Sequence, residues 1–502
     1  TADLTVGAAI TSSSNVVYRG GAQTANFAIT SSGSGNIEFY PTTTFTKSTT
    51  TFDAGGSILI GSESSPAGSL TLSTGNLKAG ADVRIYSSAT ITQGAAIEAG
   101  DEIVLTATGS ATNVLANSGL SAGAGGISLK AQQDVLFNST SKNVTTSGGG
   151  DIIIWANASG SGGEVDTGGT SVSINSNGGD IVIAGGADNG ANGGTIGDGI
   201  PDNFLLGRTL DHTARLEAPM SSGNGNILVR SQAVASSGAN ALSAILVDAG
   251  VQITATAGNI RFDGRQNAAN TSTNNQYGIW LGNEGAKAVL RSASGNVILN
   301  GDASLSNRSQ RRGIALLGVD IIATTGNIEL NGASPDQVQS FDLLGWATST
   351  VTAGGNILVS GARTSATEFI TFNAGGTTTF TVGQLIGGDA GTNTSPTASV
   401  ATAFTGSGAL VIEPFAQSFS NAQSMSNITI GSSINSLRIG KSGNATAVTI
   451  PTTSSYSIAG NIQVFGGNIT VDGSQTTTNS GNITITPSGA YSGSGTLNSA
   501  GT

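Results

Sequence analysis

The residues best suited to chemistry lie in one Gly-rich segment near the middle of the chain. Asp188 is followed by Asn189 and Gly190, and Asp198 and Asp202 flank the sequence Gly-Ile-Pro. Carboxylate and carbonyl oxygens on Gly-rich loops are the ligands that Ca²⁺ prefers. Asp188, Asp198 and Asp202 are therefore the candidate metal ligands, although the alternating Asp residues that usually precede such a loop are missing. A plain loop held by Asx turns is the favoured interpretation.

Residues for nucleophilic or histidine catalysis are sparse. The single histidine, His212, follows Asp211, and a surface histidine is favoured over a general base. Residues 119–123 match Gly-x-Ser-x-Gly, a sequence that a chain rich in Gly and Ser contains by chance. The chain has no Cys, so disulfides, thiolate metal sites and cysteine nucleophiles are excluded.

Carboxylate catalysis also lacks a clear signal. Enzymes that cleave polysaccharides need clustered carboxylates, usually with Arg, Lys or His. The 30 acidic residues are spread over 502 positions, Asp302 and Asp320 stand isolated, and Glu329 is expected to face solvent. We find no two carboxylates at one strand position of adjacent repeats with a basic partner. The sequence therefore predicts a protein that is not an enzyme and needs no cofactor.

The elements that carry these residues are periodic. The motif Gly-Asn followed by Ile or Val recurs at Asn296, Asn327 and Asn356. The spacing is about 30 residues, which is typical of solenoids. Each repeat holds short runs of Ile, Val or Leu separated by Gly, Asn, Ser or Thr, which predicts short strands joined by turns. In Ile328–Leu330 the outer two residues point one way and Glu329 the other, as in a half-buried strand.

Stacking is the way for such strands to bury their apolar face. The next repeat covers that face and pairs the backbone N–H and C=O groups, which predicts an all-β parallel β-helix with about 30 residues per coil. Asn and Asp tolerate turn conformations, and stacked copies of the turn are expected to form Asn ladders. The nine Gly-Asn-Ile/Val copies are at Asn36, Asn226, Asn259, Asn296, Asn327, Asn356, Asn461, Asn468 and Asn482.

Composition agrees with a narrow solenoid. Only 37% of the residues are hydrophobic and 5% aromatic, so a column of small cores is easier to fill than one wide globule. The net charge of −11 argues against a nucleic-acid partner, and the Arg311–Arg312 pair is expected in a loop facing solvent. No apolar run is long enough for a transmembrane segment, and no signal peptide precedes Thr1, which suggests a segment of a longer or processed chain.

The pattern changes along the chain in five steps. Residues 1–183 are expected to form N-terminal β-helix coils, 184–222 a Gly-rich insertion, 223–363 regular coils, 364–426 divergent coils rich in Phe, and 427–502 C-terminal coils. Insertions in solenoids often carry binding functions. In residues 364–426 the Phe side chains are expected to fill the core rather than to form a carbohydrate-binding platform, because several alternate with Thr.

Three phrases resemble a known family. They are Gly179–Gly186, Ile439–Asn444, and Tyr456–Ile462 leading to Gly467–Ile469. These resemble the filamentous-haemagglutinin-like exoproteins and β-strand-repeat adhesins of Gram-negative bacteria. The resemblance implies a right-handed parallel β-helix, exported by two-partner secretion or a related route, at the cell surface or outside the cell. It brings no catalytic residues.

These observations lead to one expected function and one alternative. We expect a structural or adhesive extracellular protein, a cell-surface fibre, adhesin or matrix filament. Its sticky end coils are expected either to be continued by a longer chain or to let copies stack end to end. Its receptor, a host, cell-surface or glycan structure, is not encoded in any motif. The alternative is a β-helix that binds or cleaves polysaccharide.

Overall fold

The computed structural model describes residues 2–137, 142–158, 163–169, 171–185, 212–233, 242–266, 275–283, 285–305, 311–335, 340–387 and 401–501. These residues form strands, turns and bends and contain no helix. The chain divides into two compact units. Unit 1 comprises Thr1–Val234 and Ile253–Gly258, and unit 2 comprises Ala235–Gln252 and Asn259–Thr502.

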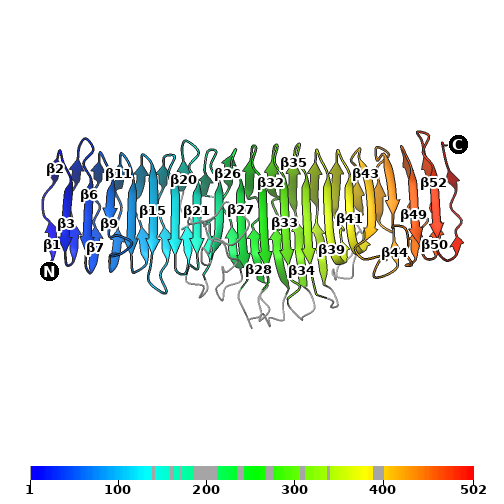
Figure 1. Ribbon diagram of the computed structural model, residues 1–502, viewed down its shortest axis with the longest axis horizontal. Coiled ribbons are helices and arrows are strands. Elements are labelled where there is room, and N and C mark those ends of the chain that lie inside the picture. The colour runs from blue at the N-terminus through cyan, green and yellow to red at the C-terminus, as the bar shows by residue number, and fades with distance from the viewer. Residues whose placement is uncertain are drawn as a thin grey trace. The chain divides into compact units, whose positions relative to one another are not determined.

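Unit 1 is a parallel β-helix in which each coil supplies three strands, and each strand pairs in parallel with its counterpart in the next coil (Figure 1). The first strands of the coils are β1 (Leu4–Val6), β4 (Gln23–Ala25), β7 (Thr44–Lys47), β10 (Ser69–Leu72), β13 (Ile91–Gln93), β16 (Val114–Ala116), β19 (Val135–Phe137), β22 (Val165–Asp166) and β25 (His212–Leu216). The second strands are β2 (Ile10–Ser12), β5 (Ile29–Ser31), β8 (Phe52–Ala54), β11 (Asn76–Ala79), β14 (Ala96–Ala99), β17 (Leu120–Ala122), β20 (Lys142–Thr146), β23 (Val172–Asn175), β26 (Met220–Gly223) and β29 (Gln252–Ala255). The third strands are β3 (Val16–Gly20), β6 (Ile37–Pro41), β9 (Ile58–Ile60), β12 (Val83–Ser87), β15 (Glu102–Ala107), β18 (Gly126–Ala131), β21 (Ile152–Ala156), β24 (Ile181–Gly185) and β27 (Ile227–Gln232).

Unit 2 has the same parallel construction. Its first strands are β28 (Leu242–Val247), β31 (Gln276–Leu281), β34 (Arg311–Leu317) and β37 (Phe341–Ala347), and later β44 (Gln423–Ser424), β47 (Val448–Ile450), β50 (Ile469–Val471) and β53 (Tyr491–Ser492). Its second strands are β32 (Ala288–Ser292), β35 (Val319–Ala323), β38 (Ser349–Ala353), β40 (Ile370–Ala374), β42 (Thr402–Phe404), β45 (Ile428–Ile430), β48 (Tyr456–Ile458), β51 (Gln475–Thr477) and β54 (Leu497–Asn498). Its third strands are β30 (Ile260–Arg265), β33 (Val297–Asp302), β36 (Ile328–Ala333), β39 (Ile357–Ala366), β41 (Thr378–Ile386), β43 (Ala409–Pro414), β46 (Ser436–Ile439), β49 (Ile462–Gly466) and β52 (Ile483–Pro487).

The core of each unit consists of side chains stacked coil upon coil. One column of unit 1, in register throughout, is Ile37, Ile58, Val83, Ile103, Ile127, Ile152, Ile181 and Ile227. Seven of these eight are fully buried, and Ile127 is 2% exposed. Burial of each such side chain stabilises the fold by about 1.5–3 kcal/mol. The columns of buried side chains therefore hold the coils together. The predicted parallel β-helix is confirmed.

Coil length varies more than the sequence pattern indicated. In unit 2, Asn327 and Asn356 stand 29 residues apart, close to the expected repeat of about 30. Asn259 and Asn296 stand 37 residues apart, so this coil is longer. The spacing is 21 residues between Asn15 and Asn36. It is again 21 between Asn461 and Asn482. The shorter coils omit loop residues and keep the three strands.

Two expectations about single regions have clear outcomes. Phe372, Phe380 and Phe404 pack together in the core with ring centroids 5.0–5.6 Å apart, which confirms the core-filling interpretation for these three. The solvent-facing loop expected for Arg311–Arg312 is wrong, because both residues belong to β34 and are 0% and 2% exposed. Arg312 Nη1 donates to Asn275 Oδ1 at 2.7 Å, and its guanidinium lies 5.5 Å from the Tyr277 ring centroid.

Of the expected insertion at 184–222, β25 and β26 occupy its C-terminal part and pair within the β-helix. Residues 186–211 lie outside the described residues.

Candidate functional site

One cluster of charged side chains in unit 1 is built on β12, the residue before it and β15. Because Val83 pairs with Ile103, Asp82 and Glu102 stand at one position of adjacent coils. Arg84 lies between their carboxylates, with its Nη2 atom 3.2 Å from Asp82 Oδ2 and 2.9 Å from Glu102 Oε2. The three side chains remain 21–46% exposed. We call Asp82, Arg84 and Glu102 the carboxylate cluster.

The carboxylate cluster shows that one expectation is wrong, namely that no two carboxylates are aligned in adjacent repeats with a basic partner. The two acids are aligned in coils that are only 20 residues long at this point, since Arg84 pairs with Val104. A coil length of about 30 residues would not align Asp82 with Glu102 in the next coil. The similar sequences Asp82-Val83-Arg84 and Glu102-Ile103-Val104 stand 20 residues apart. Their alignment could be predicted only with knowledge that the coil is this short.

A shallow depression of about 290 Å³ borders the carboxylate cluster. Glu38, Glu63 and Tyr86 line it together with Asp82 and Arg84. Burial raises the pKa of the Tyr86 phenol, the carboxylates of Glu63 and Glu102 raise it further, and Arg84 opposes them. Burial lowers the pKa of Arg84 while Glu102 and Asp82 raise it, and the net shift is upward.

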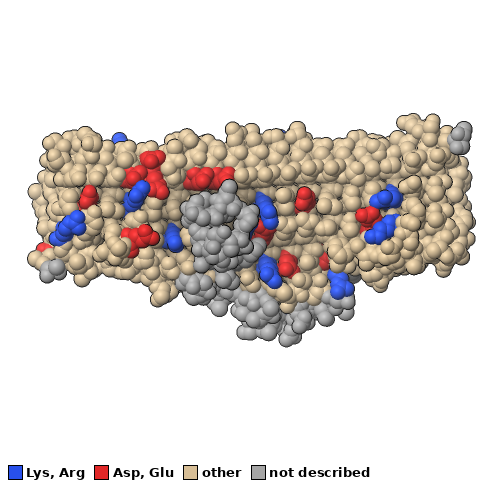
Figure 2. All heavy atoms as spheres, viewed as in Figure 1, with Lys and Arg blue, Asp and Glu red and all other residues tan. Residues whose placement is uncertain are grey.

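Chemically, this depression offers fixed hydrogen-bond acceptors, one guanidinium and one aromatic ring. Such a set can bind the hydroxyl groups of a sugar. Two carboxylates beside a sugar are also what glycoside hydrolysis requires. Figure 2 shows that charged residues on the visible face occur singly or in small groups, several of which contain both signs, separated by uncharged surface.

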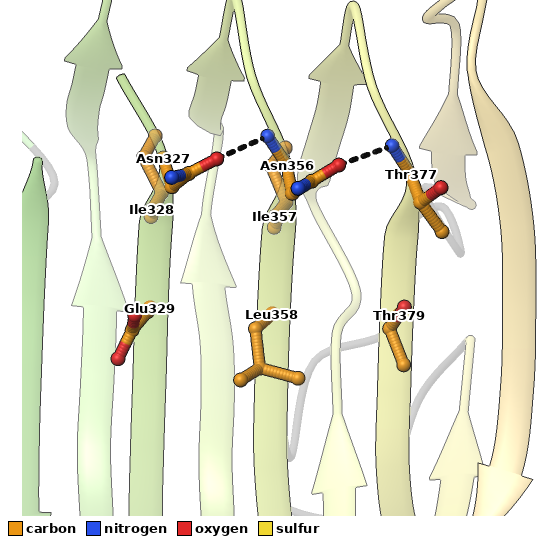
Figure 3. A pocket seen from close by; sticks show the side chains of 8 residues that line it. All are labelled: Asn327, Ile328, Glu329, Asn356, Ile357, Leu358, Thr377 and Thr379. Carbon is orange, nitrogen blue, oxygen red and sulfur yellow. Dashed lines mark hydrogen bonds between the residues drawn. The ribbon is translucent and has the colours of Figure 1, made fainter.

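The predicted Asn ladders are present on the turns before the third strands. In unit 2, Asn327 Oδ1 accepts the Asn356 backbone N–H at 2.7 Å, and Asn356 Oδ1 accepts the Thr377 N–H at 2.8 Å (Figure 3). The ladder extends to Asn296 and Asn259 through bonds of 2.8 Å each. Each side chain thus satisfies a backbone donor of the next coil, where the turn leaves it without a strand partner.

Unit 1 has a ladder of the same kind. Asn15 Oδ1 accepts the Asn36 N–H at 2.9 Å, and Asn36 Oδ1 accepts the Ser57 N–H at 2.8 Å. Asp151 and Asp180 take the same role further along, each accepting the next coil's N–H at 2.7 Å. Asp therefore replaces Asn in this turn, as the sequence indicated.

A depression of about 350 Å³ follows the unit 2 ladder, and Glu329, Leu358 and Thr379 line it in one row across three coils (Figure 3). Glu329 is half-buried there on the outer face. Its neighbours are one apolar and one hydroxyl side chain, so this depression has no second acid for catalysis.

Asp302 and Asp320, expected to be isolated, each have a basic neighbour. Asp302 Oδ2 lies 3.5 Å from Arg265 Nε, and Asp320 Oδ1 lies 2.7 Å from Lys287 Nζ. Sequence spacing hid these pairs because the partners belong to different coils, 33 residues apart in the case of Lys287 and Asp320.

The predicted metal ligands Asp188, Asp198 and Asp202 lie outside the described residues. Within the described residues, no group of three or more His, Asp or Glu side chains is placed to hold a metal ion. His212 begins β25, and Asp211 lies outside the described residues. The part of the chain that the structure describes includes no helix of the length and apolarity needed to cross a membrane.

Comparison of the chain with protein-family models, with curated proteins and with solved structures finds no match. The functional assignment therefore depends on the geometry of the β-helix and its surface.

Proposed function

We propose that this chain is a non-enzymatic structural or adhesive protein of the cell surface or extracellular matrix. The observation that supports this most is the continuous parallel pairing of the third strands within each unit, reinforced at the turns by Asn and Asp side chains. A column of this kind lengthens without widening its core, and it presents a long outer face on which side chains recur at every coil. Such a face suits the binding of extended or repeated partners better than it suits a single enclosed active site.

Self-assembly of copies belongs to the same proposal. On the short strands β53 and β54, the side chains of Tyr491 and Leu497 are accessible, with 48% and 40% exposed. Exposed strand edges with apolar side chains favour pairing with another strand. A head-to-tail contact between copies would continue the column and generate a fibre.

Two measurements test this function. Sedimentation and negative-stain microscopy of the purified whole chain should show concentration-dependent rods, and Tyr491→Lys with Leu497→Lys should shorten them. Beads coated with the chain should be retained on glycan-coated or cell-coated surfaces. Compact single particles at every concentration, together with no retention on any surface, would refute the proposal.

A second candidate function, binding or cleavage of polysaccharide, is supported by the carboxylate cluster. Incubation with neutral and acidic polysaccharides tests it by the appearance of new reducing ends or unsaturated products. Activity that is lost in Glu102→Gln and kept in Glu329→Gln, a matched outer-face carboxylate without a second acid beside it, would replace the non-enzymatic proposal. No product from any polysaccharide would eliminate cleavage and leave binding to be measured directly.

A further inference from the structure

A row of four residues marks one corner of the unit 2 coils, where the chain turns into the second strands. The residues are Lys287, Gly318, Thr348 and Phe369, each directly before a second strand. The following residues pair in register: Ala288 with Val319, Asp320 with Thr350, and Ser349 with Ile370. The row therefore spans four successive coils, about 14 Å at the usual spacing of strands.

This row forms one side of a depression of about 340 Å³. Its lining combines Lys287, Gly318, Thr348 and Phe369 with Trp346 from the end of β37. Gly318, with φ of +80°, has no side chain to fill the middle of the row. The depression thus has a cation at one end, an aromatic ring at the other and a hollow between them.

Phe369 has an unusual backbone for its type. Its φ is +62°, a left-handed conformation that a bulky residue adopts rarely. The backbone is held there by stacking, because the Phe369 carbonyl accepts the Ser349 N–H at 2.9 Å. In the same corner Gly318 adopts its left-handed conformation without steric cost. A phenyl ring that is half-buried at the surface in a strained position indicates a role other than core packing.

Trp346 supplies a second ring at the depression. One side of it packs against the apolar cluster of Leu344, Phe341 and Ala366 and against Ala315 and Leu317. The residue stays half-buried rather than covered. Its position is therefore fixed from behind while part of the indole is accessible.

The lysine of the depression is held by Asp320, which lies beside the depression and does not line it. Lys287 Nζ donates to Asp320 Oδ1 at 2.7 Å, and the same oxygen accepts the Thr350 hydroxyl at 2.7 Å. An ammonium group has three donors, and Asp320 takes one of them. Since the ion pair neutralises the lysine, the depression offers hydrogen-bond donors and acceptors without a net charge.

We propose that this corner is a binding subsite for a short neutral glycan. The apolar faces of the sugar rings lie against Trp346 and Phe369, and their hydroxyl groups bond to Lys287 and Thr348. Pyranose rings present both an apolar face and a polar edge, which matches this mixture of aromatic and paired polar side chains. The proposal rests on the adhesive function above and names the chemical class of one receptor. An acidic glycan fits less well, because Asp320 already compensates the only cation in the row.

The test uses the purified whole chain and four neutral disaccharides, cellobiose, lactose, maltose and N,N′-diacetylchitobiose, with digalacturonic acid as the charged probe. Saturation-transfer NMR detects binding, and titration gives Kd. We expect at least one neutral disaccharide to bind and Phe369→Gly to weaken it at least tenfold. Because Gly suits a left-handed corner, this variant should keep the melting temperature of the parent. Phe415→Ala removes a more exposed phenyl ring, 53% exposed and outside the depression, and should bind as the parent does.

Several outcomes would overturn the subsite. They are no binding of any neutral disaccharide, equal or tighter binding of digalacturonic acid, unchanged affinity in Phe369→Gly, or a sharp fall in its melting temperature, which would show that the ring is held for packing. Failure of the subsite and failure of the adhesive function are separable. If the whole chain binds no neutral disaccharide while beads coated with it are retained on surfaces, adhesion stands and the subsite falls.

Discussion

Units 1 and 2 each contain a core region filled by three stacked Phe rings. Each unit also buries a charged group, a lysine in unit 1 and an aspartate in unit 2. In unit 1, Phe39, Phe45 and Phe52 stack with centroids 4.7–6.4 Å apart, and the ammonium of Lys47 lies 5.7 Å from the Phe52 ring centroid. Lys47 Nζ donates to the carbonyls of Ser48 at 3.3 Å and Thr74 at 3.2 Å.

Unit 2 has the Phe372, Phe380 and Phe404 stack on β40, β41 and β42 and, on β37, the buried acid Asp342. Asp342 Oδ1 accepts the Ser334 hydroxyl at 2.7 Å, and Oδ2 accepts the Arg363 N–H at 2.6 Å. Burial raises the pKa of Asp342 to about 6 and lowers that of Lys47 to about 8. The apolar stacks make the two regions alike, and the buried charges make them respond to pH in opposite senses.

The largest expected effect tests the likeness of the two cores. Phe39→Ala and Phe380→Ala each remove a ring that is 0% exposed and contacts other aromatic side chains, three for Phe39 and two for Phe380. Each should lower the free energy of unfolding by about 3–5 kcal/mol, because stacked coils close only partly over the cavity. Chemical denaturation followed by circular dichroism measures it. Phe415→Ala, at the exposed surface, is the control and should cost little. If the loss of unfolding free energy at one site were more than twice that at the other, the two cores would not be alike.

The next effect concerns the difference between the regions. Asp342 has a raised pKa in the folded state, so the folded protein binds more protons than the unfolded one between its ordinary pKa of 3.8 and about 6. Stability from this group is therefore present below pH 3.8 and is lost as pH rises to about 6. Asp342→Asn should raise the stability of unit 2 at pH 7, by on the order of 3 kcal/mol at most, and should have a much smaller effect at pH 4.

Lys47 provides the matched test in unit 1. Its pKa is lowered from 10.5 to about 8, so the folded state binds fewer protons than the unfolded state between these values and stability rises with pH across that window. Lys47→Met should abolish this rise. Thermal melts from pH 4 to pH 10.5 follow both variants. If Asp342→Asn changed the slope of stability against pH above pH 8, or Lys47→Met changed that slope below pH 6, the assignment of each pH response to its own buried group would be wrong.

The contrast also explains which features the sequence could predict. Strand alternation at Ile328–Leu330 and the repeated Gly-Asn turn depend on local residue order, so the strands and the Asn ladders were predicted correctly. The carboxylate cluster depends on the register between coils, and the register depends on a coil length that shrinks to 20 residues at Arg84.

Burial of charged groups was missed for a related reason. Arg311 and Arg312 were expected in solvent because charged residues are seldom buried unless paired, and their neighbours come from other coils. Phe369 was expected in the core with the other Phe residues, and only its backbone conformation places it at the corner instead. Contacts between coils are set by loop lengths, which vary without a readable pattern.

The smallest expected effect tests whether the turn ladders are equivalent in the two units. Asn36→Ala and Asn356→Ala each remove the acceptor for one backbone N–H of the next coil, that of Ser57 and that of Thr377. Each should cost about 1 kcal/mol, since these turns are partly accessible to water and the freed donor can be hydrated. Asn→Asp at the same positions keeps the acceptor, as Asp151 and Asp180 do naturally, and should cost less.

Hydrogen exchange at the Ser57 and Thr377 amides reports the bond directly. The Ala variants should expose these two amides and leave the amides of the adjoining strands protected, because strand pairing on the far side of the turn does not depend on the side chain. Faster exchange throughout the neighbouring coils would show that the ladder maintains the register itself. In that case the Asn side chains, rather than the apolar columns, would determine how the coils stack.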